Sequence, residues 1–308
     1  MIEVLVLGAG GGGGFPQWNS HAPGCRRARA GDPMAASATQ ASVAVSGDGR
    51  HWFLLNASPD LRVQIERSPA LHPQDGLRSS PICGVVLTGA EVDTVTGLLS
   101  LRERQAFSLL ATAPVLARLD ENPIFEVLAR DVVARIAIEP GIAGPLTLTD
   151  GAPSGLRVTP FTVPGKVPLY AEGALAQPEM AREIDETIGL EITDGTSRLL
   201  FVPGCAMMTP GLRSRLEGAD CVFFDATLWR DDEMIQAGLG AKSGRRMGHM
   251  SVSGPGGVIE SFRDLAVRRK ILIHLNNSNP LLLADSEERR IAAAAGWTVA
   301  HDGMQVTL

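Results

Sequence analysis

The chain has no long apolar run, and none of its hydrophobic stretches approaches the roughly 20 residues that a membrane-spanning helix needs. Its first residues, Met1–Gly8, include an acidic side chain and lack the basic segment and cleavage signal of a secretory peptide. These absences argue against a membrane span and a signal peptide. We therefore expect a cytoplasmic protein.

Cysteine is also scarce, and its four positions are Cys25, Cys83, Cys205 and Cys221. None of them forms a C-x-x-C pair. Two lie inside apolar, strand-like runs, where a thiol behaves as a small buried hydrophobe. The pattern predicts no disulfide framework, which fits a reducing compartment.

Basic charge is not in excess, because 28 Lys and Arg residues face 34 Asp and Glu residues and the net charge is −6. A protein that binds duplex nucleic acid usually presents a concentrated basic face. The nearest feature is the short cluster Arg26-Arg27-Ala28-Arg29, which is better explained as a solvated loop. We predict no nucleic-acid partner.

What is present indicates an ordinary globular protein of 308 residues, with 44% hydrophobic and 20% charged residues, long enough to bury a large core. Strand-like and helix-like segments alternate without a repeat or a low-complexity linker. We predict an α/β chain with a single domain over residues 1–308, in which mixed sheets pack in the middle and helices lie outside. Strands are expected at Ile2–Leu7, Ser42–Val45, Trp52–Asn56, Gly84–Leu87, Leu156–Thr162, Gly189–Ile192, Leu199–Val202, Cys221–Phe224 and Ile271–His274. Helices are expected at Thr96–Gln105, Pro114–Leu119, Ile124–Ala137, Pro210–Glu217, Asp231–Ala237, Gly257–Asp264 and Ser286–Ala295.

The end of the chain carries two local signals. Thr298–Val299 and Met304–Leu308 flank Asp302-Gly303, which predicts a closing hairpin. Ser286 precedes two glutamates and an apolar run, which is typical of a helix N-cap.

A glycine motif near the start resembles a nucleotide-binding fingerprint. Gly8-Ala9-Gly10-Gly11-Gly12-Gly13 satisfies G-x-G-x-x-G after a strand. A dinucleotide fold needs a helix to begin there, with its N-terminus on the pyrophosphate. Phe15-Pro16 follows instead, so we expect a tight backbone bend or a close approach to a ligand.

Seven segments, in order along the chain, carry a resemblance to a known family. They are Gly12–Asn19 (GGGFPQWN), Asn56–Asp60 (NASPD), Val163–Tyr170 (VPGKVPLY), Val202–Ala206 (VPGCA), Asp231–Met234 (DDEM), Met247–Met250 (MGHM) and Ile273–Pro280 (IHLNNSNP). With them the chain resembles the protein B family of pyrroloquinoline quinone (PQQ) biosynthesis. The resemblance implies a metallo-β-lactamase-like αββα sandwich, two mixed sheets packed face to face with helices outside.

The resemblance also implies a role in making PQQ from a ribosomal peptide. One expectation is an enzyme that oxygenates the tyrosine of a Glu-Tyr-derived precursor with iron. The alternative is a non-catalytic carrier that takes part in transporting PQQ or its precursor to the periplasm. Other PQQ-pathway proteins are the implied partners, and a homodimer is a further expectation.

The segment that aligns with the metal-binding loop of this fold is incomplete. The family usually shows D/N-x-x-x-D-H, whereas this chain has Gly89-Ala90-Glu91-Val92-Asp93-Thr94. Asp93 is retained, Gly89 has no side chain, and Thr94 replaces the histidine. Glu91 is an alternative ligand, and Asp93 is alternatively a helix N-cap. The losses favour the carrier more than family membership alone would.

Later positions of the motif survive. Asp225 and His274 end strands, and His249 lies in a glycine-flanked turn. We predict Asp93, Asp225, His249 and His274 as metal ligands, with Asp93, His249 and His274 as catalytic residues. Such a set suits Fe(II) oxygen chemistry, and it equally suits Zn(II) that generates hydroxide. The alternative is that Asp225 caps Thr227 and the following helix and that the histidines are structural.

Two further expectations concern zinc and substrate. The family often carries a cysteine cluster after Gln17-Trp18-Asn19, but only Cys25 remains here, so a structural zinc is not expected. A Glu-Tyr-derived substrate carries carboxylates that cations and amides can bind. The candidates are Lys166, Arg62, Asn276 and Asn277, with Arg245 and Arg246 as similar cations.

Overall fold

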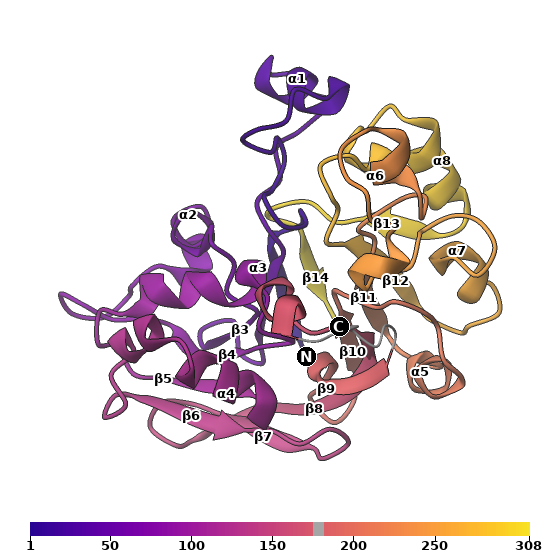
Figure 1. The fold of residues 1–308 in the computed structure, drawn as a ribbon. Helices are drawn as coiled ribbons and strands as arrows, with labels where there is room; N and C mark the ends of the chain where they lie inside the picture. The colour runs from indigo at the N-terminus through magenta and orange to yellow at the C-terminus, as the bar shows by residue number, and fades with distance from the viewer. Residues whose placement is uncertain (175–181) are drawn as a thin grey trace.

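Two sheets lie face to face in the computed structural model, which describes residues 1–174 and 182–308. In that part of the chain each sheet has seven strands, in the orders β14-β1-β2-β3-β4-β5-β6 and β13-β12-β11-β10-β9-β8-β7. Helices flank the pair of sheets on both outer sides (Figure 1). This is the αββα sandwich that the family resemblance implies, and it fits the mixed sheets and outer helices predicted from the residues.

Both sheets are mixed. β1–β2–β3 run antiparallel and β3 to β6 run parallel, while in the second sheet β7 to β10 run antiparallel and β10 to β13 parallel. The first sheet contains β1 (Glu3–Gly8), β2 (Ser42–Ser46), β3 (Trp52–Leu55), β4 (Ile82–Val86), β5 (Phe107–Ala111), β6 (Val133–Ala137) and β14 (Gln305–Thr307). The second contains β7 (Gly144–Thr147), β8 (Pro153–Gly165), β9 (Arg182–Thr193), β10 (Arg198–Val202), β11 (Cys221–Asp225), β12 (Arg269–Ile273) and β13 (Trp297–Val299).

The helices are short. The α-helices are α1 (Pro23–Arg29), α2 (Leu61–Glu66), α3 (Val92–Val95), α4 (Ala113–Asp120), α5 (Pro210–Leu216), α6 (Glu233–Gln236), α7 (Val258–Ser261) and α8 (Glu287–Ala294). The 3-10 helices are η1 (Pro69–Leu71), η2 (Thr96–Leu101), η3 (Pro123–Val127), η4 (Leu169–Ala174), η5 (Arg245–Met247) and η6 (Pro280–Leu282). Among the described residues, no helix is long and apolar enough to cross a bilayer.

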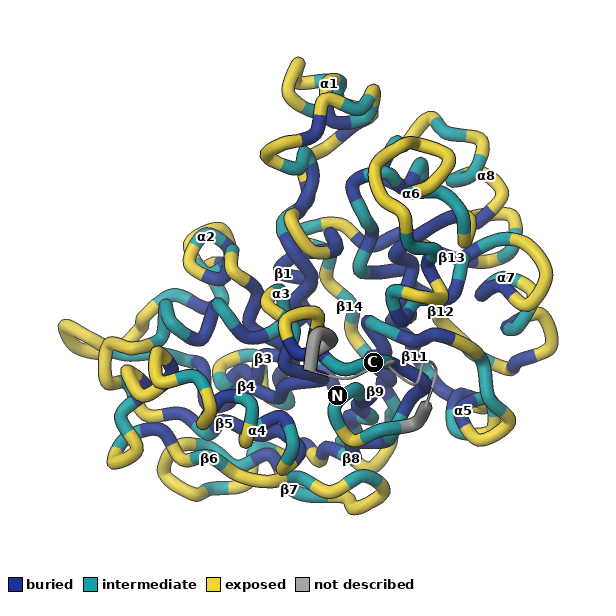
Figure 2. Tube along the Cα trace, in the orientation of Figure 1, coloured by how far each residue is buried: buried dark blue, intermediate teal, exposed yellow. Residues whose placement is uncertain are grey.

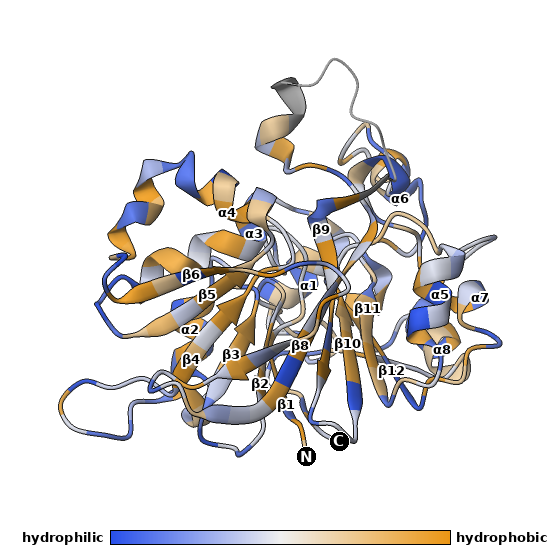
Figure 3. Ribbon diagram, turned by 90° about the horizontal axis from the view of Figure 1, so that it is seen from below, coloured by the Kyte–Doolittle hydropathy of each residue, from blue (hydrophilic) through white to orange (hydrophobic). Residues whose placement is uncertain are grey.

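Both faces of the central strands are buried, as the dark strands of Figure 2 show. In β3, Phe53 and Leu55 join the core between the sheets, while Trp52 and Leu54 pack in a second core beneath the helices of the first sheet. Successive side chains of a strand point to opposite faces, so a strand buried on both sides reads as continuously apolar. Figure 3 shows this hydrophobic character across the sheets.

The predicted C-terminal hairpin is wrong. β13 pairs with β12 in the second sheet, whereas β14 pairs with β1 in the first. The chain crosses between the sheets at Asp302-Gly303, where Gly303 has φ +83 and donates its N–H to Val6 O at 2.8 Å. A turn does form at Asp302-Gly303, but it connects strands of different sheets and not the two strands of a hairpin.

The predicted helix Ile124–Ala137 is also wrong. A 3-10 helix, η3, is followed by the strand β6, which pairs with β5 in parallel. The open edge of β5 supplies hydrogen-bond partners that the local sequence does not reveal. The predicted helices Pro114–Leu119, Pro210–Glu217 and Ser286–Ala295 are confirmed, whereas Thr96–Gln105 is a 3-10 helix only as far as Leu101, and Asp231–Ala237 and Gly257–Asp264 contain only the four-residue helices α6 and α7. The Ser286 side chain accepts the Arg289 N–H at 3.1 Å as an N-cap.

Candidate metal centre

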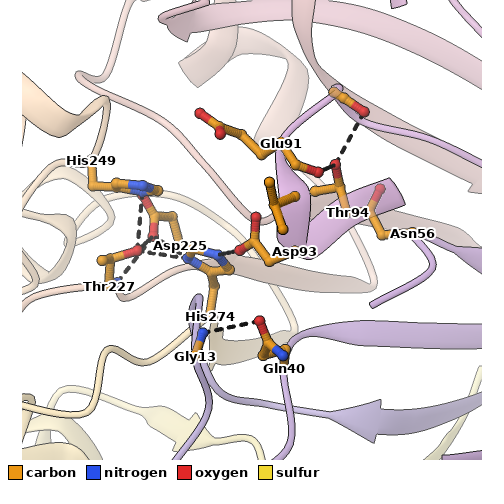
Figure 4. Close-up of polar contacts among 12 residues, drawn as sticks. Gly13, Gln40, Asn56, Glu91, Asp93, Thr94, Asp225, Thr227, His249 and His274 are labelled. Carbon is orange, nitrogen blue, oxygen red and sulfur yellow. Dashed lines mark hydrogen bonds and ion pairs between the residues drawn. The ribbon is translucent and has the colours of Figure 1, made fainter. Parts of the chain in front are cut away.

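Four predicted ligands meet at the loops that follow the strands of both sheets (Figure 4). Asp225 is the last residue of β11, and His274 directly follows β12. These strands are parallel neighbours, with Asp225 in register with Ile273, so their carboxyl ends lie together. His249 follows η5, and Asp93 comes from α3 on the first-sheet side.

Asp225, His249 and His274 form the tightest group. Each offers one potential metal-ligand atom, and these atoms all lie within 4.8 Å of one another. Asp225 Oδ2 is 2.7 Å from His249 Nδ1, and Asp225 Oδ1 is 3.9 Å from His274 Nδ1. The two imidazole rings are stacked, with centroids 5.2 Å apart and planes inclined by 22°.

Asp225 is fully buried, and its carboxylate is also fixed by the backbone. Its oxygens accept the N–H groups of Cys205 at 3.1 Å and Thr227 at 3.0 Å. Asp225 therefore binds the backbone and hydroxyl of Thr227 together with the histidines. It does not cap the following helix, because the N-cap of α6 is Asp232.

Asp93 joins the group through His274, because its Oδ2 lies 2.9 Å from His274 Nε2. Burial raises the pKa of Asp93, but the hydrogen bond and charge of His274 outweigh it and hold that pKa below its usual range. Burial lowers the pKa of His274, but Asp93 and Asp225 outweigh it and raise that pKa. Each partner therefore stabilises the charged form of the other.

Thr227 is a member of the site that the sequence did not reveal. Its Oγ1 lies 2.7 Å from Asp225 Oδ1, 3.0 Å from His249 Nδ1 and 2.7 Å from His274 Nδ1. A threonine two residues after a strand-end aspartate carries no ligand signal of its own. Only the spacing Asp225-Ala226-Thr227 hinted at a local contact.

The glycine segment that follows β1 in the first sheet forms backbone hydrogen bonds with the residue after His274. Leu275 donates its N–H to Ala9 O at 3.0 Å and accepts the Gly11 N–H at 2.6 Å, next to His274. The residues after Gly8 form turns, and the first helix begins only at Pro23. The expectation that no helix opens at the glycine motif is confirmed.

In the incomplete loop, the polar side chains of Thr94 and Glu91 bind neighbouring protein groups. Thr94 Oγ1 is 2.8 Å from Glu91 O and 3.1 Å from Gly89 O, so its hydroxyl supports the loop backbone. Glu91 binds Lys166 Nζ at 3.0 Å and the Leu169 N–H at 3.2 Å. The polar groups of Thr94 and Glu91 thus bind the loop backbone, Lys166 and the Leu169 N–H.

A pocket of about 840 Å³ opens beside these residues, and Asp93, His249 and His274 line it. Of the predicted substrate-binding residues, Lys166 and Asn276 lie in its wall. Arg62 is exposed on α2 and is not part of the lining. Asn277 is buried and donates its amide to Gln17 Oε1 instead.

Arg245 and Arg246 belong to η5, near His249, and are exposed outside the pocket lining. Cys25 is buried, with its thiol 3.7 Å from Asn277 Oδ1. Within residues 1–174 and 182–308, the three-residue group above is the one cluster of His, Cys, Asp and Glu arranged to hold a metal ion. That no structural zinc is bound near Cys25 stays a prediction.

Comparison with known proteins places the chain in a family. A model of the β-lactamase superfamily domain matches residues 51–275. The chain is 66% identical to coenzyme PQQ synthesis protein B of Gluconacetobacter diazotrophicus and 52% identical to that of Xanthomonas campestris pv. campestris, with 100% of both chains covered in each case. The chain belongs to the coenzyme PQQ synthesis protein B family.

A solved structure of the PQQ synthesis protein B family is similar throughout. The Zn(2+)-bound PqqB from Methylobacterium extorquens matches 99% of this chain and 100% of its own, with 47% identity and a TM-score of 0.95. A diphosphatase of the PhnP family, at 18% identity and a TM-score of 0.68, shares the fold alone.

The residues of this chain fit a divalent metal ion. The carboxylates of Asp225, which is buried, and of Asp93, which is partly exposed, lie at hydrogen-bonding distance from the two imidazoles. The carboxylates outweigh the positive charge unless both rings are protonated, so a cation is electrostatically favoured between them. Imidazole nitrogen and carboxylate oxygen are ligands that suit both Zn(II) and Fe(II).

Proposed function

We propose that this chain is a metal-dependent enzyme of PQQ biosynthesis that oxygenates the tyrosine of a Glu-Tyr-derived precursor. The single observation that supports it most is the assembled group Asp225, His249 and His274 beside an open pocket, with Asp93 against His274. Perturbed titratable groups gathered in a cleft are typical of catalytic sites.

His249 and His274 would hold the ion, with Asp93 and Asp225 as the two carboxylates of the site. Bound iron supplies the oxygen and one-electron chemistry that protein side chains lack, whereas zinc has no redox chemistry. The relative from Methylobacterium extorquens is Zn(2+)-bound, which supports metal binding in this family and leaves the position and choice of metal to experiment.

The chain's own residues bind and orient the substrate. The Lys166 ammonium carries three donors, and its contact with Glu91 at 3.0 Å fixes its position in the pocket wall. A substrate carboxylate can share this ammonium with Glu91. Asn276 lies in the wall two residues after His274, and its amide N–H groups donate to Ser278 Oγ at 2.6 Å and Met234 Sδ at 3.2 Å. We therefore assign its Oδ1 to a second polar group of the substrate.

The loop around Thr94 favours a second function. Its hydroxyl contacts Gly89 O and Glu91 O, and so it offers the pocket no imidazole where the family has one. Loss of a ligand weakens metal affinity and alters an open coordination site. The second candidate is therefore a non-catalytic carrier of PQQ or its precursor in the same pocket, with transport to the periplasm as its role.

The test is an anaerobic Fe(II) titration of metal-free protein, followed by O2 and a Glu-Tyr substrate. The enzyme account predicts iron binding and a hydroxylated product, both lost in His274→Ala. An exposed-histidine variant, His301→Ala, is the matched control because His301 lies outside the pocket lining. Bound PQQ or precursor with unchanged substrate would instead support the carrier.

A further inference from the structure

We propose that Thr227 is a positioning residue whose hydroxyl holds both imidazoles by Nδ1, so that Nε2 of His249 and of His274 is the nitrogen presented to a bound cation. This inference rests on the metal dependence proposed above. It adds a residue and a choice of ligand atom to that site.

The first question is which partner the Thr227 hydroxyl donates to and which partners it accepts from. Thr227 Oγ1 has one hydrogen and two acceptor sites, and it lies 2.7 Å from Asp225 Oδ1, an atom that can only accept while ionised. The hydroxyl therefore donates to Asp225. Its lone pairs then face His249 Nδ1 at 3.0 Å and His274 Nδ1 at 2.7 Å, which must each carry a hydrogen to bond there.

Asp225 reinforces this assignment for His249, because its second oxygen lies 2.7 Å from the same Nδ1. Both rings are thus fixed as Nδ1–H donors on one side. A neutral imidazole with a hydrogen on Nδ1 has its lone pair on Nε2, and metal-ligating histidines commonly donate their other ring N–H in this way.

These contacts engage Nδ1 of each ring and leave Nε2 for another partner. His274 Nε2 lies 2.9 Å from Asp93 Oδ2, so a ring nitrogen and a carboxylate already converge. His249 lines the pocket, and among the described residues its hydrogen bonds are made through Nδ1. A cation at the outer edge needs no displacement of Thr227.

Thr227 is itself held by groups other than the histidines. Its side chain is nearly buried, and its carbonyl accepts the Asn276 N–H at 3.0 Å and the Asn279 amide at 3.3 Å. These bonds tie the end of β11 to the loop that follows His274. These backbone bonds fix the position of the Thr227 hydroxyl independently of the histidines, as a residue that orients metal ligands requires.

The test compares Thr227→Val, which keeps the shape and removes the hydroxyl, with Thr227→Ser, which keeps the hydroxyl. Dissociation constants for Zn(II) and Fe(II) are measured by chelator competition on metal-free protein. We expect valine to weaken binding about 10- to 100-fold and serine to leave it near the wild-type value. Thermal unfolding of both variants checks that the fold is intact.

A second measurement needs no variant. Nitrogen-15 NMR of the histidine rings in zinc-loaded wild-type protein should show metal-bound Nε2 and protonated Nδ1 for both residues. Coordination through Nδ1, or unweakened binding by Thr227→Val, overturns the role of Thr227 while leaving metal binding in place. Wild-type protein that binds neither metal overturns the proposed function instead, and the inference with it.

Discussion

His274 has a backbone conformation that is unusual for a residue with a side chain, with φ +64. Left-handed backbone costs about 1–2 kcal/mol for most residues, and asparagine tolerates it best after glycine. Asn56, at φ +67, shows that this chain places asparagine in the same region at the end of β3. With this backbone conformation at the end of β12, the His274 imidazole contacts Asp93 and Thr227.

The Asp93–His274 pair gives the metal-free protein a defined pH dependence. The raised pKa of His274 contributes stability that is complete below about pH 6.5 and lost as pH rises through the folded-state value. The lowered pKa of Asp93 contributes stability that is complete above about pH 3.9 and lost as pH falls through its folded-state value. The pair is therefore most stabilising between these limits.

His274→Asn removes the cation and keeps a residue that tolerates the backbone. We expect it to lower the free energy of unfolding more at pH 5.5 than at pH 8.5, by on the order of 1 kcal/mol. Urea unfolding in the presence of a chelator measures the difference. An equal loss at both pH values would contradict the ion pair.

At the residue scale, the sequence best predicted which side chains lie at strand ends, and metal binding by those side chains stays a prediction. Asp225 and His274 stand out because a polar residue follows a buried run, and parallel neighbours bring such ends together. Thr227 could not be found in this way, because its role depends on the distances to two rings from other loops. Arg62 and Asn277 looked plausible only because sequence order does not show which way a side chain points.

At the scale of elements, the segment that carries Asp93 is seated on the loop after β3. Ala57 donates its N–H to Thr94 O at 2.8 Å, and Gly97 donates its N–H to Ala57 O at 2.9 Å. Asn56 joins this loop to the end of β4 through Thr88, with bonds of 2.8 and 2.9 Å. The position of Asp93 therefore depends on a close approach of two backbones.

Gly97 permits that approach. A Cβ there would overlap Ser58 O and lie 2.8 Å from the Ala57 carbonyl carbon and oxygen, all of them backbone atoms. We expect Gly97→Ala to cost about 3 kcal/mol and to weaken metal binding, because the backbone must move. Gly144→Ala is the matched control, since a Cβ on that strand glycine meets nothing within 4 Å.

Denaturant unfolding and chelator competition on both variants check this prediction. A Gly97→Ala protein as stable as Gly144→Ala would show that the two backbones are not locked together. If the Gly97→Ala variant had both wild-type stability and wild-type metal affinity, the position of Asp93 would not depend on the contact between the Ala57 and Gly97 backbones.

Strands buried on both faces were the elements most readily predicted, because continuous apolar runs reveal them. Partly exposed edge strands were not. β6 has mostly exposed or half-exposed residues and was taken for a helix, and β7 was missed. The C-terminal strands were found but assigned to one hairpin, because pairing across two sheets is a non-local property.

At the scale of the molecule, the two sheets bring residues distant in sequence to one site. Asp93 comes from the first-sheet side, whereas Asp225, His249 and His274 follow elements of the second (Figure 1). The family resemblance predicted this sandwich, and the fold confirms it. A cytoplasmic location, a homodimer and contacts with other PQQ-pathway proteins stay predictions.

The central claim is that these side chains form a metal centre, and metal content after loading tests it most directly. Metal-free wild-type protein is incubated with Zn(II) or, anaerobically, Fe(II), dialysed and analysed by elemental mass spectrometry, with His249→Ala/His274→Ala and His301→Ala in parallel. We predict about one ion per chain in wild type and His301→Ala, and almost none in the double variant. Equal metal content in the double variant and wild type would contradict the account.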